Sequence, residues 1–184
     1  MKIFISYRRA DSTYLIGRIK DRLVSVFGEE STFRDLDDIP AGVDFRDVLE
    51  RETNGCNVML VVIGPQWTSI TDTKGDRRLF NPGDYTRIEV ETGLKRLSEG
   101  KAIVIPVLVL NASMPSAQEL PLSLGQLAYQ NAISIRNDPD FNSDMERLIR
   151  DMKRIGDEII VQYFEPETIH ILEGRFWMGS LEGA

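Results

Sequence analysis

The sequence predicts an α/β domain with a flavodoxin-like, five-stranded parallel sheet in the order 2-1-3-4-5 and helices on both faces. Two observations support this fold class. Short apolar runs alternate with amphipathic stretches along the chain, which is typical of strands that alternate with helices. The runs VMLVVI (58–63) and AIVIPVLVL (102–110) are apolar almost throughout. Such runs indicate parallel strands that are buried between two layers of helices.

The elements follow one another in strand and helix pairs. The expected strands are KIFIS (2–6), STFR (31–34), NVMLVVIG (57–64), AIVIPVLVL (102–110) and AISI (132–135). The expected helices cover residues 15–26, a segment near 45–49, a segment from 85 onward that follows the start signal Asp84, and a segment from 143 to 155. Pro106 removes a backbone donor from the fourth run, which favours an edge position or a bulge there. Ser143 and Glu146 have capping-box spacing ahead of the last helix.

The chain divides at about residue 156. Residues 1–156 contain the complete alternating pattern, whereas residues 157–184 contain short apolar runs in which we expect no helix. We therefore predict one domain followed by a C-terminal extension, which is either disordered from Glu165 onward or the start of a second domain.

Composition excludes several classes of function. The 184 residues carry a formal net charge of −7 and the pI is about 4.9, which argues against non-specific nucleic-acid binding. No apolar run reaches the roughly 18 residues of a membrane span, so we expect a cytoplasmic protein without membrane contact. Cys56 is the one cysteine and His170 the one histidine. No intrachain disulfide, metal site or Ser-His-Asp set is predicted, and Cys56 is expected to be a buried, inert thiol.

A ligand site is expected at the carboxyl ends of the first and third strands, where the strand order of such a sheet reverses. The residues there are Ser6, Tyr7, Arg8 and Arg9, and Gly64, Pro65, Gln66 and Trp67. They offer hydroxyl groups, aromatic rings and two guanidinium groups suited to phosphate. The alternative is that Arg8 and Arg9 are solvated loop residues.

Three nucleotide or phosphate chemistries are excluded at this edge. A phosphoacceptor receiver domain needs a carboxylate at the end of the third strand, where this chain has Ile-Gly-Pro, and acidic partners after the first strand, where it has Tyr-Arg-Arg. A P-loop and a GxGxxG dinucleotide fold need a glycine-rich loop after a strand. No strand here is followed by such a loop.

Glu89 is a carboxylate without an obvious local role. In the stretch GDYTRIEVETGLKR (83–96), Val90 and Leu94 lie on the expected buried face of a helix, and Arg87 and Glu91 form a pair four residues apart on the opposite face. Glu89 belongs to neither face and lies at the margin of the apolar stripe. It is either a solvated carboxylate that pairs with Arg96 or a functional group.

Four segments, in order and spacing, resemble a TIR (Toll/interleukin-1 receptor) domain of the bacterial NAD-cleaving type. They are FISYRR (4–9), FRDLDDIPAGVDF (33–45), VIGPQW (62–67) and GDYTRIEVETGLKR (83–96). The resemblance covers residues 2 to about 155 and includes an aromatic residue four positions before the glutamate. It implies an NAD+ glycohydrolase that releases nicotinamide and forms ADP-ribose or a cyclic isomer. NAD+ is then the substrate, and no cofactor is needed.

The resemblance also assigns roles to residues. Glu89 is the expected catalytic carboxylate, and Tyr7 and Tyr85 are expected to flank the nicotinamide ribose. Arg8 and Arg9 would face the diphosphate or an assembly contact. Phe33 and Gly42 would shape a loop over the pocket, and Trp67 either supplies a second ring or is a packed loop residue. Many relatives have tryptophan at the position of Tyr85.

Self-assembly is the second implication of the resemblance, because the family tends to build its active site between subunits. Other TIR domains are therefore the expected partners, in a homo-oligomer or filament, and bacterial antiphage immunity is the expected setting. The expected assembly surface is the loop 34–42, with Asp35, Asp37, Asp38, Ile39 and Pro40. Two alternatives are a non-catalytic TIR scaffold that signals by homotypic binding, and base exchange on nucleosides.

The tail carries a weaker resemblance. IHILEGRFWMGS (169–180) is similar to the opening strand of formylglycine-generating-enzyme-like domains. It implies that a second domain begins in the C-terminal extension.

Overall fold

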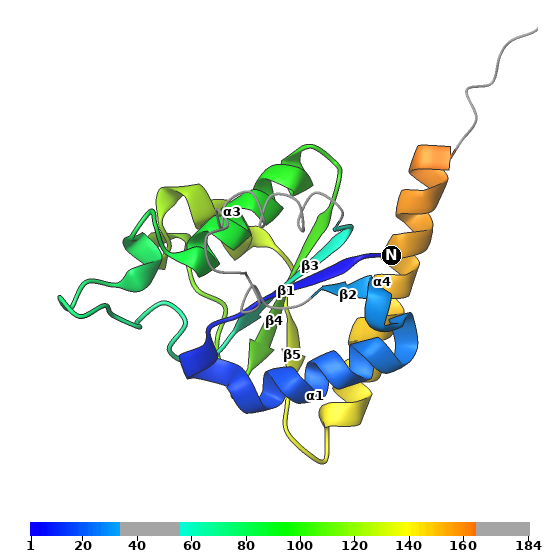
Figure 1. The fold of residues 1–184 in the computed structure, drawn as a ribbon, viewed down its shortest axis with the longest axis horizontal. Coiled ribbons are helices and arrows are strands. Elements are labelled where there is room, and N and C mark those ends of the chain that lie inside the picture. Colours follow the sequence, from blue (N-terminus) through cyan, green and yellow to red (C-terminus); the bar gives the residue numbers. More distant parts are fainter. Residues whose placement is uncertain (34–55, 165–184) are drawn as a thin grey trace, which may run out of the picture.

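The computed structural model describes residues 1–33 and 56–164, except for the side chains of residues 12, 13, 32, 33 and 156–164. Its strands form one sheet in the order β2-β1-β3-β4-β5 (Figure 1), and every neighbouring pair is parallel. The strands are β1 (Ile3–Ser6), β2 (Thr32–Phe33), β3 (Val58–Ile63), β4 (Ile103–Val109) and β5 (Ile133–Ile135). The predicted α/β class with a parallel sheet is confirmed. β1 and β3 are neighbours, and β2 contributes only two residues at the edge.

Helices cover both faces of the sheet, as predicted. The described α-helices are α1 (Arg9–Phe27), α3 (Tyr85–Ser98) and α4 (Phe141–Phe164). α1 and α4 pack on one face and α3 packs on the other (Figure 1). Short 3₁₀ helices occupy the connections: η1 (Glu29–Ser31), η3 (Arg78–Phe80), η4 (Ala117–Glu119) and η5 (Leu122–Tyr129). The helix expected near residues 45–49 lies outside the described residues.

β3 is buried along its whole length and separates two apolar clusters. Successive side chains of a strand point to opposite faces. Leu60 and Val62 therefore join the cluster under α1 and α4, whereas Met59 and Val61 join the cluster under α3. This two-sided burial is what the apolar run 58–63 predicts.

Pro106 lies inside β4, which runs between β3 and β5. The expected edge position is therefore wrong. On one side Pro106 stands opposite Val61 in register. On the other side β5 pairs only with residues 107–109, so Pro106 precedes the part of β4 that is paired there. The shortness of β5 explains why an inner strand accommodates a proline.

α4 differs from its predicted bounds at both ends. It begins at Phe141, and the Ser143 hydroxyl donates to the Asp140 carbonyl at 2.8 Å. Ser143 therefore lies within the helix, and the predicted Ser143–Glu146 capping box is wrong. The helix continues to Phe164, beyond the predicted break at residue 156. Gly156 does not end the helix, and the apolar spacing of Ile155 and the residues that follow continues through 157–164. The domain division itself stays a prediction.

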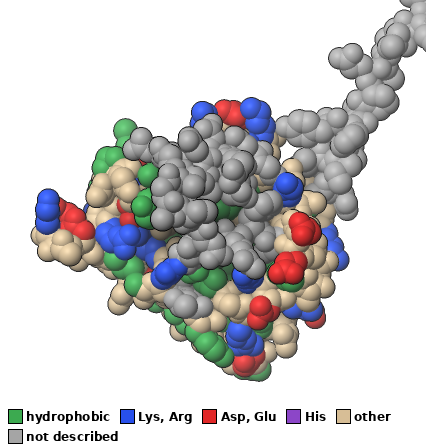
Figure 2. Space-filling view, viewed as in Figure 1, with side chains coloured by type: hydrophobic (Ala, Val, Ile, Leu, Met, Phe, Trp, Pro, Cys, Tyr) green, Lys and Arg blue, Asp and Glu red, His purple; other side chains and the backbone are tan. Residues whose placement is uncertain are grey.

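Acidic and basic side chains are interspersed over the described part of the face shown in Figure 2. In the described parts of the chain, no helix combines the length and the apolar character needed to cross a bilayer.

Candidate functional site at the junction of β1 and α3

Glu89 is buried at the junction of β1 and α3, with 7% of its surface exposed. The Ser6 hydroxyl, at the last residue of β1, donates to Glu89 Oε2 over 2.6 Å. A short bond of this kind to a charged acceptor is among the stronger protein hydrogen bonds. The interpretation of Glu89 as a solvated carboxylate is therefore wrong. Glu91, by contrast, pairs with Arg87 at 2.7 Å on the outer face of α3, as predicted.

The alternation of β1 decides which of its predicted site residues face Glu89. Phe4 packs in the cluster under α3, and Ser6, two residues further on, faces the same side and contacts Glu89. Ile5 and Tyr7 pack with the cluster under α1 and α4. Tyr7 therefore lies on the opposite face of the sheet from Glu89, and this arrangement does not support its predicted role beside the ribose.

Arg8 is a buried side chain whose guanidinium is already engaged. Its two terminal nitrogens donate to the Asp84 carboxylate at 2.8 and 3.1 Å, and its Nε donates to the Trp67 carbonyl at 3.1 Å. The alternative that Arg8 is a solvated loop residue is wrong. Because the guanidinium is bound to protein groups, the arrangement does not support the predicted contact with a diphosphate either.

Asp84 is a residue whose importance the sequence showed only in part. It was predicted to start the Glu89 helix, and its Oδ1 indeed accepts the Arg87 backbone N–H at 3.1 Å, which caps α3. The same carboxylate also receives both Arg8 bonds and lies 3.3 Å from Arg78 Nε. Its side chain is completely buried. A charged residue before a helix suggests a cap, but its partner 76 positions away cannot be read from the sequence.

Three further predicted site residues differ in how exposed their side chains are. Tyr85 is 56% exposed one turn before Glu89 on α3. Trp67 is 1% exposed and packs in the apolar cluster under α3, which favours the packed alternative over a free stacking ring. Arg9 is exposed at the start of α1.

Several predicted residues cannot be placed. The backbone of Phe33 ends β2 in register with Phe4, and its side chain lies outside the described residues. The following residues also lie outside the described part of the chain: Asp35, Asp37, Asp38, Ile39, Pro40 and Gly42.

Asp11 is a buried carboxylate that the sequence analysis missed. Its Oδ1 accepts the Gln66 backbone N–H at 2.9 Å. Its Oδ2 has no hydrogen-bond partner among the described residues and packs against Gly64, where a Cβ would overlap the carboxylate. The acidic residue in the first turn of α1 was visible in the sequence, but the close approach to Gly64 was not.

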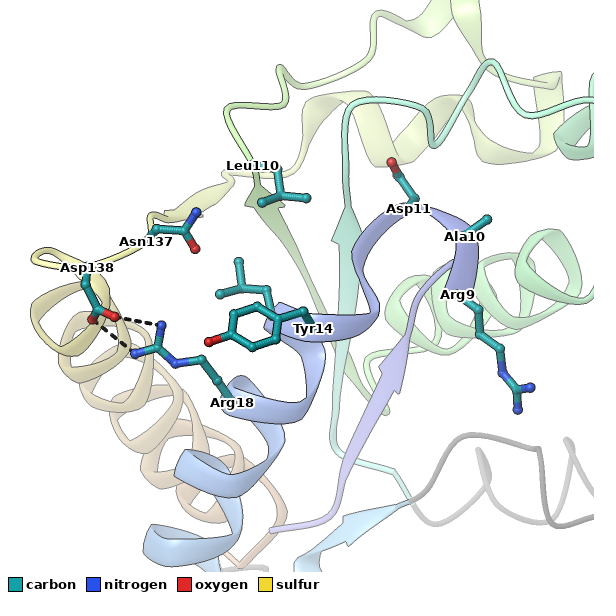
Figure 3. A pocket seen from close by; sticks show the side chains of 9 residues that line it. Arg9, Ala10, Asp11, Tyr14, Arg18, Leu110, Asn137 and Asp138 are labelled. Atoms are coloured by element: carbon teal, nitrogen blue, oxygen red, sulfur yellow. Dashed lines mark hydrogen bonds and ion pairs between the residues drawn. The ribbon is translucent and has the colours of Figure 1, made fainter.

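Described residues line hollows near the carboxyl ends of the strands, and two of these hollows lie close to the predicted site residues. The first, of about 540 Å³, lies between α1 and the residues that follow β4 and β5. Arg9, Asp11, Tyr14, Leu110 and Asp138 are among its lining residues (Figure 3). The second, of about 330 Å³, lies between the segments that follow β3 and β4, and Trp67 is among its lining residues.

The first hollow is bounded by an ion pair. Arg18 bonds to Asp138 at 3.0 Å, and Arg9 points away from this pair (Figure 3). The hydrogen bond that Arg18 donates to the Asp138 carboxylate raises the pKa of the Arg18 guanidinium. This hollow is therefore bordered by a paired cation and anion.

The chemistry available at the site is that of carboxylates, hydroxyl groups and guanidinium groups. Burial raises the pKa of the Cys56 thiol to about 11, and its S–H donates to the Val58 carbonyl. Cys56 is thus buried, as predicted, and protonated at neutral pH. Among the residues that the structure describes, no group of three or more His, Cys, Asp or Glu side chains is arranged to hold a metal ion.

The fold defines the class: an α/β domain with a parallel sheet in the order β2-β1-β3-β4-β5 and helices on both faces. The family model of the TIR domain matches residues 3–149. The chain belongs to the TIR domain family. Among solved structures, it resembles the TIR domains in the "activated Roq1 resistosome directly recognizing the pathogen effector XopQ", with 15% identity and a TM-score of 0.62. The match covers 82% of this chain and 98% of that one. Comparison with curated proteins gives no match.

Proposed function

We propose that this protein is a NAD+ glycohydrolase that becomes active on self-assembly. The observation that carries the proposal is Glu89, a buried carboxylate held by Ser6 at the carboxyl end of β1. Folds of this class bind ligands at that edge, next to the point where the strand order reverses. Membership of the TIR domain family, which includes NAD-cleaving enzymes, adds to this support.

The proposed reaction suits a single carboxylate. The bond between the nicotinamide nitrogen and C1′ of the ribose breaks, and its electron pair leaves with the nicotinamide. The departing ring loses its positive charge, so the leaving group needs no proton. Positive charge builds on C1′ and its ring oxygen, as in glycoside hydrolysis. Glu89 stabilises this charge, and its burial strengthens the interaction.

The reaction is completed by addition to C1′. Water adds its oxygen there and releases a proton, which gives ADP-ribose. Attack by another group of the same nucleotide gives a cyclic isomer instead. NAD+ is thus a substrate, and the proposal includes no bound cofactor or metal.

The neighbouring residues receive proposed roles that follow from their positions. Ser6 orients the Glu89 carboxylate through the 2.6 Å bond. Tyr85, exposed one turn before Glu89, flanks the nicotinamide ribose. Arg9, exposed at the start of α1, remains the candidate for the diphosphate.

Assembly is the proposed switch. The structural neighbour is described as a resistosome, which is an assembled state of that protein. Other copies of this TIR domain are the proposed partners here, with the loop 34–42 as the contact surface. Bacterial antiphage immunity in the cytoplasm is the proposed setting.

The test measures by chromatography how much nicotinamide is released from NAD+. It is repeated over a wide range of protein concentrations in the presence of a crowding agent. Release should increase faster than linearly with protein concentration. Glu89→Ala and Glu89→Gln should each lower it by at least about 10²-fold, the typical cost of losing a stabiliser of transition-state charge. Glu91→Gln is the matched control, because it makes the same change two residues away on the outer face of α3, and it should retain activity.

Three results would contradict the proposal. If wild-type particles assemble visibly and release no nicotinamide, the protein is a non-catalytic scaffold. If Glu89→Gln is as active as the wild type, the catalytic carboxylate is a different residue. Products that change on addition of a free base would indicate base exchange.

A further inference from the structure

Two hydrogen-bonded links join the end of β1 to the start of α3. Ser6 binds Glu89 at 2.6 Å, and Arg8 binds Asp84 at 2.8 and 3.1 Å. The two α3 residues are five positions apart, which is about 7.5 Å along a helix axis. A single link would leave the helix free to pivot about it. Two links at this separation fix both the height and the rotation of the first turns of α3 relative to β1.

The second link is rigid because each of its partners is held elsewhere. Asp84 also caps α3 through the Arg87 N–H, and Arg8 Nε also binds the Trp67 carbonyl. Since Trp67 packs in the core, the planar guanidinium is attached to three segments: the end of β1, the turn after β3 and the first turn of α3. Its fixed geometry makes it suited to this task, which a lysine could not perform in the same way.

The other half of α3 is positioned by close packing. Gly93 lies directly against Met59 of β3, so that a Cβ there would overlap the Met59 side chain. Val90 and Leu94 are buried in the same cluster. Glu89 therefore lies between an apolar contact at Gly93 and the hydrogen-bonded pair Arg8–Asp84, which we call the clamp. If the clamp is lost, the packed half stays in place and the turn that leads to Glu89 shifts.

We propose that Arg8 and Asp84 are positioning residues for the Glu89 carboxylate. The proposal rests on the glycohydrolase function and replaces the expectation that Arg8 binds the substrate diphosphate. The clamp acts through Glu89 and touches no substrate. It should therefore affect the chemical step more than the binding of NAD+.

The chain offers a matched control for the clamp. Asp144 lies in the first turn of α4 and accepts three bonds from Arg136, at 2.8, 2.9 and 3.0 Å. Its side chain is 7% exposed, and it lies on the opposite face of the sheet from Glu89. Asp144→Asn thus makes the same chemical change in another arginine pair, whose Arg136 side chain is 54% exposed, on the opposite side of the sheet from Glu89.

The experiment compares the assembled wild-type chain with Asp84→Asn, Arg8→Lys and Asp144→Asn. Asparagine is a good N-cap, so Asp84→Asn keeps the start of α3 while it weakens the arginine pair. Arg8→Lys keeps the charge and loses the two-pronged geometry. Both should lower kcat by roughly 10- to 10²-fold, the scale expected of a misplacement of about 1 Å, with KM changed by less than about threefold. Asp144→Asn should lose less stability than Asp84→Asn, because Arg136 is 54% exposed and Arg8 is buried, and it should keep the wild-type kcat.

A second readout does not depend on turnover. The carbon-13 resonance of the Glu89 carboxyl, assigned by its loss in Glu89→Gln, should move in Asp84→Asn and Arg8→Lys and stay in place in Asp144→Asn. If the wild type releases no nicotinamide, the proposed function fails, and this resonance alone decides whether the clamp positions Glu89.

Two results would overturn the clamp. In the first, KM rises while kcat stays constant, which would return Arg8 to substrate binding. In the second, the clamp variants and Asp144→Asn lose kcat equally, or the Glu89 resonance moves in none of them, which would leave Arg8 and Asp84 with a role in stability alone.

Discussion

The two faces of the sheet differ in the side chains that they bury. The cluster under α1 and α4 is apolar. Asp144 and its partner Arg136 lie at its margin, and the buried Asp11 lies in the first turn of α1. At the junction of β1 and α3, the buried side chains include five polar or charged ones: Ser6, Arg8, Asp84, Thr86 and Glu89. Burial of such groups costs free energy unless each is hydrogen-bonded, so packing alone gives no reason for them. The larger number of buried polar groups at the junction of β1 and α3 supports the proposal that the chemistry takes place there.

The largest effect on stability is expected on the apolar face. Leu148 of α4 is fully buried there, and Leu148→Ala should lower the free energy of unfolding by about 2–5 kcal/mol through the cavity that it leaves. Urea denaturation measures this loss. At temperatures well below its unfolding midpoint, the variant should release nicotinamide at the wild-type rate. A large loss of turnover in the folded variant would show that the two faces are not separate in function.

A smaller effect on stability is expected from Gly93→Ala on the other face. Alanine gains about 1 kcal/mol of helix propensity, and crowding against Met59 costs about 1–3 kcal/mol, so the net loss should be about 1 kcal/mol. Turnover should nevertheless fall, because α3 carries Glu89. Thermal denaturation measures the loss of stability, and nicotinamide release measures the loss of turnover. Unchanged turnover in Gly93→Ala would contradict the link between α3 position and activity.

The smallest expected effect is the pH dependence of the stability that Asp144 contributes. The hydrogen bonds that Asp144 accepts from Arg136 hold the pKa of the Asp144 carboxyl below its usual value. This pair therefore stabilises the fold above the unfolded pKa of about 3.9, and the contribution is lost as the pH falls through the lower folded pKa. The stability difference between the wild type and Asp144→Asn should be constant from neutral pH to about pH 5 and shrink below about pH 4. Urea titrations at several pH values measure it. If the stability difference between the wild type and Asp144→Asn stays constant down to pH 2, the contribution of Asp144 does not depend on its ionised carboxylate.

Much of the fold could be predicted because its signals are local. The apolar run 58–63 requires burial on both faces, and Asp84 marks a helix start. The misplaced elements show where local signals fail. Whether Pro106 is tolerated depends on the length of β5, 27 positions further along the chain, and Ser143 has the right spacing for a cap only if the helix starts there.

The sequence singles out Glu89 because it fits neither face of its helix, and the structure confirms only that Glu89 is not solvated. Its catalytic role follows from the family resemblance and stays a prediction. The misassigned neighbours depend on geometry at long range. Strand alternation separates Tyr7 from Ser6, and the bond between Arg8 and Asp84 joins residues 76 positions apart. The sequence shows that two arginines follow β1, but it does not show that the Arg8 guanidinium binds Asp84 and the Trp67 carbonyl.

The buried thiol has a practical consequence for the study of assembly. Cys56 is the one cysteine of the chain, and its pKa of about 11 leaves almost no reactive thiolate at neutral pH. Leu122 on η5 is fully exposed, so Leu122→Cys would give each molecule one reactive attachment point. Donor and acceptor dyes placed there on separate batches would report the meeting of two molecules by energy transfer. The native cysteine would not have to be removed first.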